Sequence, residues 1–261
     1  MILNEIVAHK KSELDRLKAD FPVKGLIQGL KMRIKQLPPT RDFIKAVKGK
    51  GIKIIAEVKK ASPSKGVIRK DFDPIEIARI YEINGAAAIS VLTEERYFHG
   101  HIDYLKEIKG AVSIPVLRKD FIFDEYQVYE AFLAEADALL LIVAALEKQQ
   151  LKSLLSVAHA LNLECLVETH SDEEIKIALD AGANIIGINA RNLKTFVLDK
   201  TLFKKYAHLI PSGRVKVAES GLENSNDLKE VYSKGANAAL IGTSIMSSNN
   251  IQQKLKDLTN F

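Results

Sequence analysis

Apolar and polar positions follow one another along this chain in a regular succession, in which short apolar runs each end in a polar cluster. Eight such runs cover residues 52–66, 87–95, 113–121, 138–146, 163–171, 184–196, 214–222 and 237–246. The distance between successive starts ranges from 35 residues (52 to 87) down to 21 residues (163 to 184). This period accommodates a strand, a helix and their connections, whereas a hairpin needs far less. The pattern therefore predicts eight βα units that close into a (β/α)8 TIM barrel.

Helix start and stop signals lie between these runs. Asp73-Pro74 offers an N-cap followed by a proline in the first turn, and Ser171 with Glu174 has the spacing of a capping box. Three connections from a helix to the next strand share one sequence pattern, in which a glycine ends the helix and an alanine follows it. These are Asn84-Gly85-Ala86, Ala181-Gly182-Ala183 and Lys234-Gly235-Ala236, a faint internal repeat of the βα unit.

Residues 1–48 lie outside the eight-unit pattern. Apolar positions spaced for one helical face predict an amphipathic helix over residues 2–21. They are Leu3, Ile6 or Val7, Leu14, Leu17 and Phe21. Pro38-Pro39 precedes a second short candidate at residues 42–47. Periodicity alone does not decide where this N-terminal segment lies, whether beneath the barrel, beside it or over its mouth. We predict a single barrel domain over residues 1–261, with 1–48 as an N-terminal helical extension.

Composition limits the classes of protein to which the chain can belong. With 261 residues, 47% of them hydrophobic, it has the size of one barrel with a modest extension. The net charge of +5 is scattered over helices beside acidic residues, so we expect no nucleic-acid partner. No apolar run reaches 18 residues and the first residues lack a signal-peptide pattern, so we expect a cytoplasmic protein without a membrane partner. The single cysteine, Cys165, excludes an intrachain disulfide and a thiolate zinc site, and we expect it to be buried and unreactive.

Polar side chains close the apolar runs, where a barrel gathers its active-site residues in the loops after the strands. A lysine there can act as a general acid, a Schiff-base nucleophile or a fixed charge, and a partly buried glutamate can act as a base. A solvated loop or a structural ion pair is the alternative for each residue. An unpaired acid at the end of a buried strand is costly, which makes that alternative weakest for Glu57 and Glu168. The full set is Glu57, Lys59, Lys119, Glu168, Asn189, Arg191 and Glu219.

Two glycine-containing turns predict a phosphate site. Gly242-Thr243-Ser244 leads from the last strand into a helix, and Ser220-Gly221 follows the seventh strand. Barrels commonly bind phosphate in the loops after these two strands, where glycine lets backbone N–H groups approach the anion. Basic residues around Ser62 and Ser64, after the first strand, also suit a small anionic ligand.

Seven segments, taken in order, resemble the signature segments of the indole-3-glycerol phosphate synthase family of tryptophan biosynthesis. They are IIAEVKKASPSKG, ISVLTEERYFHG, VLRKDFI, CLVETH, GINARNLKTF, AESGL and LIGTSIM, and the N-terminal extension is a further family trait. The resemblance implies a carboxy-lyase that converts 1-(2-carboxyphenylamino)-1-deoxyribulose 5-phosphate by ring closure, decarboxylation and dehydration, without cofactor or metal. The expected partner is this small phosphorylated molecule. We expect the chain to be a monomer or a weak homodimer.

The resemblance also implies roles for single residues. Lys119 matches the lysine that protonates the ribulose carbonyl, Glu168 matches an acid–base glutamate, and Glu57 with Lys59 matches a first-strand pair whose part in dehydration stays open. The expected catalytic residues are Lys119, Glu168, Glu57, Lys59, Asn189 and Glu219. The expected substrate-binding residues are Arg191, Ser220, Ser62, Gly221, Gly242, Thr243, Phe98 and Phe121, although both phenylalanines fit a core equally well. We expect residues 2–21 and 42–47 to shield the aromatic end of the substrate.

Three other functions compete with this interpretation. An isomerase of phosphoribosyl anthranilate in a similar barrel would need an early cysteine base, and residues 1–60 contain none. A thiazole-synthase-like barrel would use a lysine Schiff base, which borohydride would trap in the presence of substrate. A catalytically inactive barrel that senses a phosphorylated ligand is the third, although the expected charged residues are all present.

Overall fold

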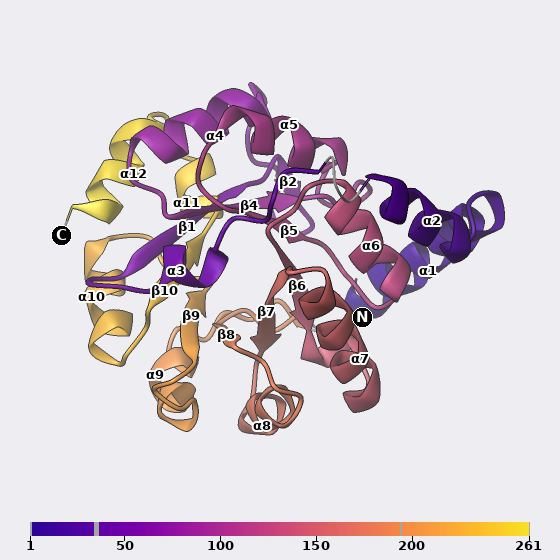
Figure 1. Cartoon of the computed structure of the whole chain (residues 1–261). Helices are drawn as coiled ribbons and strands as arrows, with labels where there is room; N and C mark the ends of the chain where they lie inside the picture. The colour runs from indigo at the N-terminus through magenta and orange to yellow at the C-terminus, as the bar shows by residue number, and fades with distance from the viewer. Residues whose placement is uncertain (1, 34–36, 194, 261) are drawn as a thin grey trace.

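Eight parallel strands form a closed barrel in the computed structural model, which describes residues 2–33, 37–193 and 195–260 (Figure 1). Around the barrel the order is β1-β10-β9-β8-β7-β6-β5-β4, so each strand pairs with its neighbour in the chain and the last pairs with the first. This confirms the predicted (β/α)8 barrel. The strands are β1 (Lys53–Val58), β4 (Ala88–Leu92), β5 (Val116–Lys119), β6 (Ala138–Ile142), β7 (Glu164–Thr169), β8 (Ile185–Asn189), β9 (Val215–Glu219) and β10 (Ala238–Ile241).

Helices surround the barrel, as Figure 1 shows in a view toward its interior. Those that follow strands are α4 (Pro74–Ile83), α5 (Asp103–Ala111), α6 (Glu125–Leu133), α7 (Lys148–Ala160), α8 (Asp172–Asp180), α9 (Leu202–Tyr206), α10 (Ser225–Ser233), α11 (Thr243–Met246) and α12 (Ile251–Thr259). Short 3-10 segments η1 (Val143–Ala145) and η2 (Ala207–Leu209) follow β6 and α9. A small hairpin, β2 (Ala61–Ser62) with β3 (Gly66–Val67), lies in the loop after β1 and has no signal in the apolar pattern.

The predicted caps are present with one difference. Asp73 caps α4, and the three helix-ending glycines adopt left-handed φ values of 88°, 91° and 90° at Gly85, Gly182 and Gly235. The Ser171 hydroxyl accepts the Glu174 N–H, but the Glu174 carboxylate accepts the N–H of His170 instead of returning to Ser171. The second half of the predicted capping box is therefore shifted by one residue.

Alternation along each strand separates two cores and thereby positions the site. In β1, Ile54, Ala56 and Val58 pack against the surrounding helices, whereas Ile55 joins the cluster inside the barrel. Because side chains in a strand alternate between two faces, the residue after Ala56 must also face the interior. That residue is Glu57. In four other strands an apolar residue that faces the barrel interior is likewise followed, on the same face, by a polar residue at the strand end. These pairs are Leu117 and Lys119 in β5, Leu166 and Glu168 in β7, Ile185 and Asn189 in β8, and Val217 and Glu219 in β9.

Cys165 lies on the opposite face of β7 from Glu168 and points toward the surrounding helices. It is 1% exposed, and burial raises the pKa of its thiol. The prediction of a buried thiol is confirmed, and the raised pKa is in line with low reactivity.

The bottom of the barrel, where the strands begin, is closed by α3 (Phe43–Val47). Phe43 and Val47 are fully buried against interior residues such as Ile55 and Val215. Arg41, just before this helix, donates its N–H to the Asp137 carboxylate at 2.6 Å. The expectation that residues 42–47 shield a ligand at the mouth is therefore wrong, because this segment packs at the opposite end.

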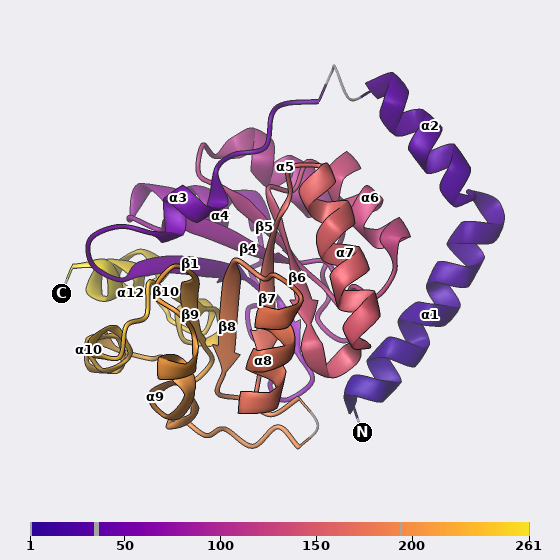
Figure 2. The same cartoon turned by 60° about the horizontal axis from the view of Figure 1, so that its bottom comes forward.

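The first helix, α1 (Ile2–Asp20), reaches the mouth of the barrel, where the strands end. Leu3 and Ile6 are buried in the interior cluster together with Phe121, which follows β5. In Figure 2 the N-terminus of α1 lies toward the β8–α9 loop, and α2 (Val23–Arg33) continues toward the other end. The expected helix over residues 2–21 is confirmed, and its first half lies over the mouth.

The second half of α1 departs from the predicted stripe. Leu14 packs with Leu26 of α2 and with Tyr126, but Leu17 and Phe21 are 46% and 50% exposed. Here the apolar contacts of the helix are with α2, α6 and the segments beside them, and they do not extend to Leu17 and Phe21. The sequence pattern missed α2, because Gly25 and Gly29 lower its helix propensity.

No helix among the described residues is long and apolar enough to cross a membrane.

Candidate active site

A cavity of about 590 Å³ opens at the mouth of the barrel. Every residue predicted for the site from the sequence contributes to its wall. These are Lys119, Glu168, Glu57, Lys59, Asn189, Glu219, Arg191, Ser220, Ser62, Gly221, Gly242, Thr243, Phe98 and Phe121. Residues that are up to 186 positions apart in the chain (57 to 243) therefore converge, as the strand parity requires.

Two lysines share one carboxylate at the centre of the cavity. The Lys59 ammonium lies 2.6 Å from Glu57 Oε1, and the Lys119 ammonium lies 3.7 Å from Glu57 Oε2. Burial opposes the ionisation of Glu57, but the two lysines outweigh it, and the pKa of Glu57 is lowered. Burial likewise opposes the charge on Lys119, yet Glu57, Glu168 and Glu219 raise its pKa. Both groups are therefore charged at neutral pH.

Glu168 and Glu219 form a second pair of acids with a different character. They are 1% and 2% exposed, and Oε1 of each is buried without a hydrogen-bond partner. Burial and the charge of Glu168 raise the pKa of Glu219 well above its ordinary value, and Lys119 offsets this only in part. Like charges side by side in a buried site disfavour double ionisation. Burial and the neighbouring carboxylate therefore favour the protonated form of Glu219.

Two glycines leave the space that these carboxylates occupy. A Cβ on Gly187 would lie 2.0 Å from Oε1 of Glu219, and a Cβ on Gly242 would lie 2.1 Å from Oε1 and 2.9 Å from Cβ of Glu57. The sequence assigned Gly242 to phosphate binding. Its wall position agrees with that, but any side chain there would also displace Glu57, so a substitution tests both roles at once.

Asn189 and Arg191 organise the loop after β8. Asn189 Oδ1 accepts the Arg191 N–H at 2.9 Å, and the Arg191 guanidinium donates to the carbonyl of Phe196 at 3.1 Å. Phe196 has a left-handed φ of 59° and lines the cavity. Lys194, which belongs to the same sequence segment, is outside the described residues.

One side of the cavity is apolar. Phe98 and Phe121 lie with their ring centroids 6.2 Å apart, and Leu140, Ile142 and Leu193 complete this part of the wall. An aromatic ring fits such a surface. Phe121 also belongs to the interior cluster that contains the start of α1.

The loops after β9 and β10 provide polar groups for an anion. Ser220 and Gly221 have left-handed φ values of 65° and 72°, so the backbone turns sharply after Glu219. No side chain caps the first turn of α11, which begins at Thr243. Free N–H groups at a helix start attract anions. Lys254 of α12 lines the same part of the cavity.

Only part of the basic cluster near Ser62 faces the cavity. Lys59 and Lys65 line it. Arg69 instead donates to the carbonyls of Met246 and Ser248, and Lys60 lies 5.8 Å from the centre of the Phe72 ring. Two of the basic residues near Ser62, Lys60 and Arg69, thus make structural contacts instead of facing the cavity.

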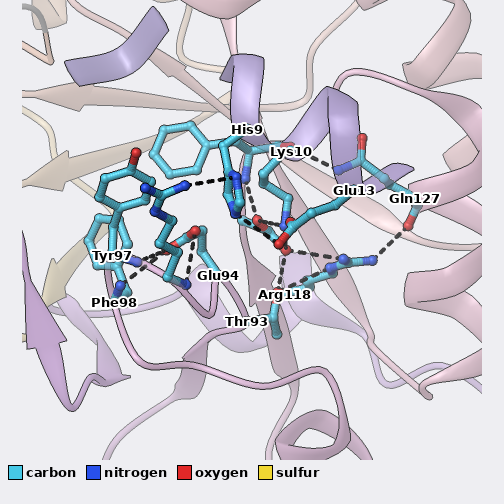
Figure 3. A network of polar contacts seen from close by, with 12 residues as sticks. His9, Lys10, Glu13, Thr93, Glu94, Tyr97, Phe98, Arg118 and Gln127 are labelled. Atoms are coloured by element: carbon cyan, nitrogen blue, oxygen red, sulfur yellow. Dashed lines mark hydrogen bonds and ion pairs between the residues drawn. The ribbon is translucent and has the colours of Figure 1, made fainter. Parts of the chain in front are cut away.

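A polar network joins α1 to the end of β5, next to Lys119 (Figure 3). The Lys10 ammonium lies 2.9 Å from Asp120 Oδ1, while Thr93 and Arg118 donate to Oδ2. Burial would raise the pKa of Asp120, but Lys10 and Arg118 lower it to about 2. Sequence reasoning missed Lys10, Asp120 and Lys254 as site residues. Lys10 and Lys254 lie within helices and carry no strand-end signal, whereas Asp120 lies at the end of the run 113–121 but was overlooked beside Lys119.

Comparisons with known proteins agree with this geometry. Solved structures at low identity share the fold: 3-hexulose-6-phosphate synthase matches with a TM-score of 0.65 at 16% identity, over 80% of this chain and 98% of that one. A thiamine phosphate pyrophosphorylase from Pyrococcus furiosus matches with a TM-score of 0.60 at 17% identity, over 79% and 93%.

Sequence relatives are much closer. An indole-3-glycerol phosphate synthase from Dehalococcoides mccartyi is 47% identical over 99% of this chain and 100% of its own. One from Campylobacter curvus is 48% identical over 99% of both chains. The family model described as indole-3-glycerol phosphate synthase matches residues 3–258. The chain therefore belongs to the indole-3-glycerol phosphate synthase family.

Proposed function

We propose that the family's reaction is divided at this mouth among Lys119, Glu168 and the Lys59–Glu57 pair. As a member of the family the chain is a decarboxylating lyase of tryptophan biosynthesis that acts on a phosphorylated small molecule. The reaction converts 1-(2-carboxyphenylamino)-1-deoxyribulose 5-phosphate to indole-3-glycerol phosphate, carbon dioxide and water. The observation that supports the division is the convergence of two lysines and three buried carboxylates on one cavity.

Ring closure needs a proton donor at the ribulose carbonyl, because its oxygen gains electrons as the aromatic carbon attacks. Lys119 is suited to this step, since the surrounding carboxylates raise the pKa of its partly buried amine and keep it protonated. It gives its proton to the carbonyl oxygen while the new carbon–carbon bond forms. Carbon dioxide then leaves from the same aromatic carbon, and the electrons of the broken bond restore the aromatic ring.

Dehydration needs an acid for the departing hydroxyl and a base for a carbon-bound proton. Glu57 is a poor base, because Lys59 and Lys119 hold its carboxylate and lower its pKa. Glu168 is the better base, because its buried Oε1 makes no hydrogen bond. Lys59 then protonates the hydroxyl, which leaves as water, and Glu168 removes the proton, so that the electrons of the carbon–hydrogen bond complete the indole double bond.

The substrate spans the cavity from its aromatic side to its polar turns. We place the anthranilate ring against Phe98 and Phe121, and the phosphate at Ser220, Gly221 and Thr243 with Lys254 beside it. Inorganic phosphate should therefore compete with the substrate. Lys254→Met should weaken that competition and raise KM, with little change in kcat.

Single-turnover kinetics separates the proposed steps. Lys119→Met should slow ring closure about 10²- to 10⁴-fold and alter substrate affinity far less. Lys119→Arg should not restore the rate, because a guanidinium hardly gives up its proton. Glu168→Gln should leave ring closure intact and let the decarboxylated, hydrated intermediate accumulate. Near-normal ring closure in Lys119→Met would transfer the acid role to Lys59.

A further inference from the structure

His170 lies behind the cavity wall, two residues after Glu168, and has no part in the reaction described above. Its side chain is 10% exposed, and it follows the last residue of β7. It is absent from the residues that line the cavity. Its contacts nevertheless reach two of them.

Both ring nitrogens of His170 face oxygen atoms. Nε2 lies 3.0 Å from the Arg191 carbonyl and 3.5 Å from Oε1 of Glu168. Nδ1 lies 3.3 Å from the Glu174 carboxylate, which also accepts the His170 N–H at 2.7 Å. A carbonyl and an ionised carboxylate can only accept hydrogen bonds, so both nitrogens must carry protons to satisfy this arrangement. The geometry thus selects an imidazolium.

The charged groups around the ring also favour its protonated form. Among the described residues, the ionisable groups that face it are Glu168 on β7 and Glu174 on α8, whereas the β8–α9 loop presents the main chain of Arg191. Burial opposes the charge on His170, but Glu174, Glu168 and the Arg191 carbonyl raise its pKa.

We propose that His170 is a positioning residue of this active site, whose protonated imidazole fixes Glu168 and the main chain at Arg191 relative to one another. Oε1 of Glu168 makes no hydrogen bond, so the imidazolium at 3.5 Å orients that oxygen by charge while leaving it free to accept a proton. The same ring contacts the main chain of Arg191, in the loop that follows Asn189 at the end of β8. The inference rests on the role proposed for Glu168 as a base.

Three variants separate the charge from the hydrogen bonds. His170→Gln keeps a donor that can reach the Arg191 carbonyl but carries no charge. His170→Asn keeps a group near Nδ1 and loses the contact with Arg191, and His170→Phe loses both. We expect the rate of dehydration to fall about 10- to 100-fold in His170→Phe, the range for a lost hydrogen bond to a charged group, and less in His170→Gln. His208→Gln, on the exposed surface, is the matched control and should retain the wild-type rate.

The pH dependence distinguishes positioning by charge from a structural role. Below the raised pKa of His170 the wild type has the imidazolium, and the ratio of its dehydration rate to that of His170→Gln should be largest. As pH rises through that pKa the ring becomes neutral and the ratio should approach one. Glu174→Gln removes a carboxylate that stabilises the charge, so it should move this transition to lower pH. A ratio that does not depend on pH would overturn the proposal.

A separate readout does not depend on turnover. The imidazole chemical shifts of His170, followed by NMR in the enzyme without substrate, should titrate above the ordinary value of 6.5 and move to lower pH in Glu168→Gln. Titration at or below 6.5 would contradict the imidazolium. If Glu168→Gln dehydrates at the wild-type rate, the proposed base is wrong, whereas a slow Glu168→Gln beside a wild-type His170→Phe would reject only the positioning role.

Discussion

Both ends of this barrel contain buried acidic residues, but these residues differ in their hydrogen-bond partners. At the bottom, the Asp137 carboxylate accepts the N–H groups of Arg41 and Val116 and pairs with the Lys109 ammonium. Arg41 continues the network to the carbonyls of Ile114 and Lys109. At the mouth, Glu168 and Glu219 each keep a buried oxygen without a hydrogen bond.

The comparison distinguishes carboxyl groups that stabilise the fold from carboxyl groups that are available to interact with a substrate. A buried carboxylate with several donors is satisfied and belongs to the structure. Glu164, at the start of β7, also has a buried oxygen without a hydrogen bond, so an unpaired oxygen alone does not identify the site. At the mouth two such oxygens, on Glu168 and Glu219, belong to residues that line the cavity, where the missing partner can come from outside. The same side-chain types can therefore serve opposite functions, and the partners of each oxygen together with its access to the cavity distinguish them.

The largest expected effect is on stability at the bottom. Asp137→Asn should lower the free energy of unfolding by about 3–5 kcal/mol, because it leaves Lys109 buried without its counter-ion. Urea unfolding measures this. The double variant Asp137→Asn with Lys109→Met should recover much of the loss, since an apolar replacement of a buried pair is often tolerated. A single variant as stable as the wild type would remove the contrast between the two ends.

At the mouth a small apolar change should affect catalysis more than stability. Gly187→Ala places a methyl group where Oε1 of Glu219 lies, and a displacement of about 1 Å costs about 10²-fold in rate. Gly110→Ala, where a Cβ meets nothing within 4 Å, is the control and should keep the wild-type kcat. Glu219→Asp shortens the acid, so the pair Gly187→Ala with Glu219→Asp should lose less than the sum of the single effects. Strict additivity would show that the two positions do not interact.

The contact between α1 and β5 should have a smaller effect that depends on pH. Lys10 and Arg118 lower the pKa of Asp120 to about 2, so this carboxylate stabilises the fold above its ordinary value of 3.8 and loses that contribution as pH falls toward 2. Lys10→Met should remove about 1.5 kcal/mol at neutral pH, and because the variant starts from this lower stability it should unfold at a higher pH on acidification. Acid unfolding followed by circular dichroism tests this. An unchanged acid transition would mean that Lys10 does not contribute to the low pKa.

The fold could be predicted from the sequence because each barrel strand is a short apolar run at a regular interval. The eight apolar runs and the three Gly-Ala connections are almost sufficient by themselves to predict the barrel. The hairpin of β2 and β3 has two-residue strands, too short for a pattern, and α2 carries two glycines in eleven residues. The exposure of Leu17 and Phe21 depends on how far α1 extends beyond the barrel, which periodicity does not encode.

The site could be predicted wherever a functional residue ends a strand, since strand parity directs Glu57, Lys119, Glu168 and Glu219 to one cavity. Residues that reach the site from elsewhere carry no such signal. Lys10 and Lys254 lie within amphipathic helices, where a lysine is ordinarily a solvated residue. His170 ends an apolar run but contacts the site from behind.

The protonation state of Glu219 separates the two ends most directly, and infrared spectroscopy measures it. Because burial and Glu168 raise its pKa, the folded protein binds a proton there that the unfolded chain releases. The wild-type spectrum minus that of Glu219→Gln at neutral pH should show a protonated carboxyl band that shifts in D₂O. The corresponding difference for Asp137→Asn should show an ionised carboxylate instead. An ionised carboxylate band for Glu219 at neutral pH would contradict the distinction between the fully paired Asp137 at the bottom and the incompletely paired Glu219 at the mouth.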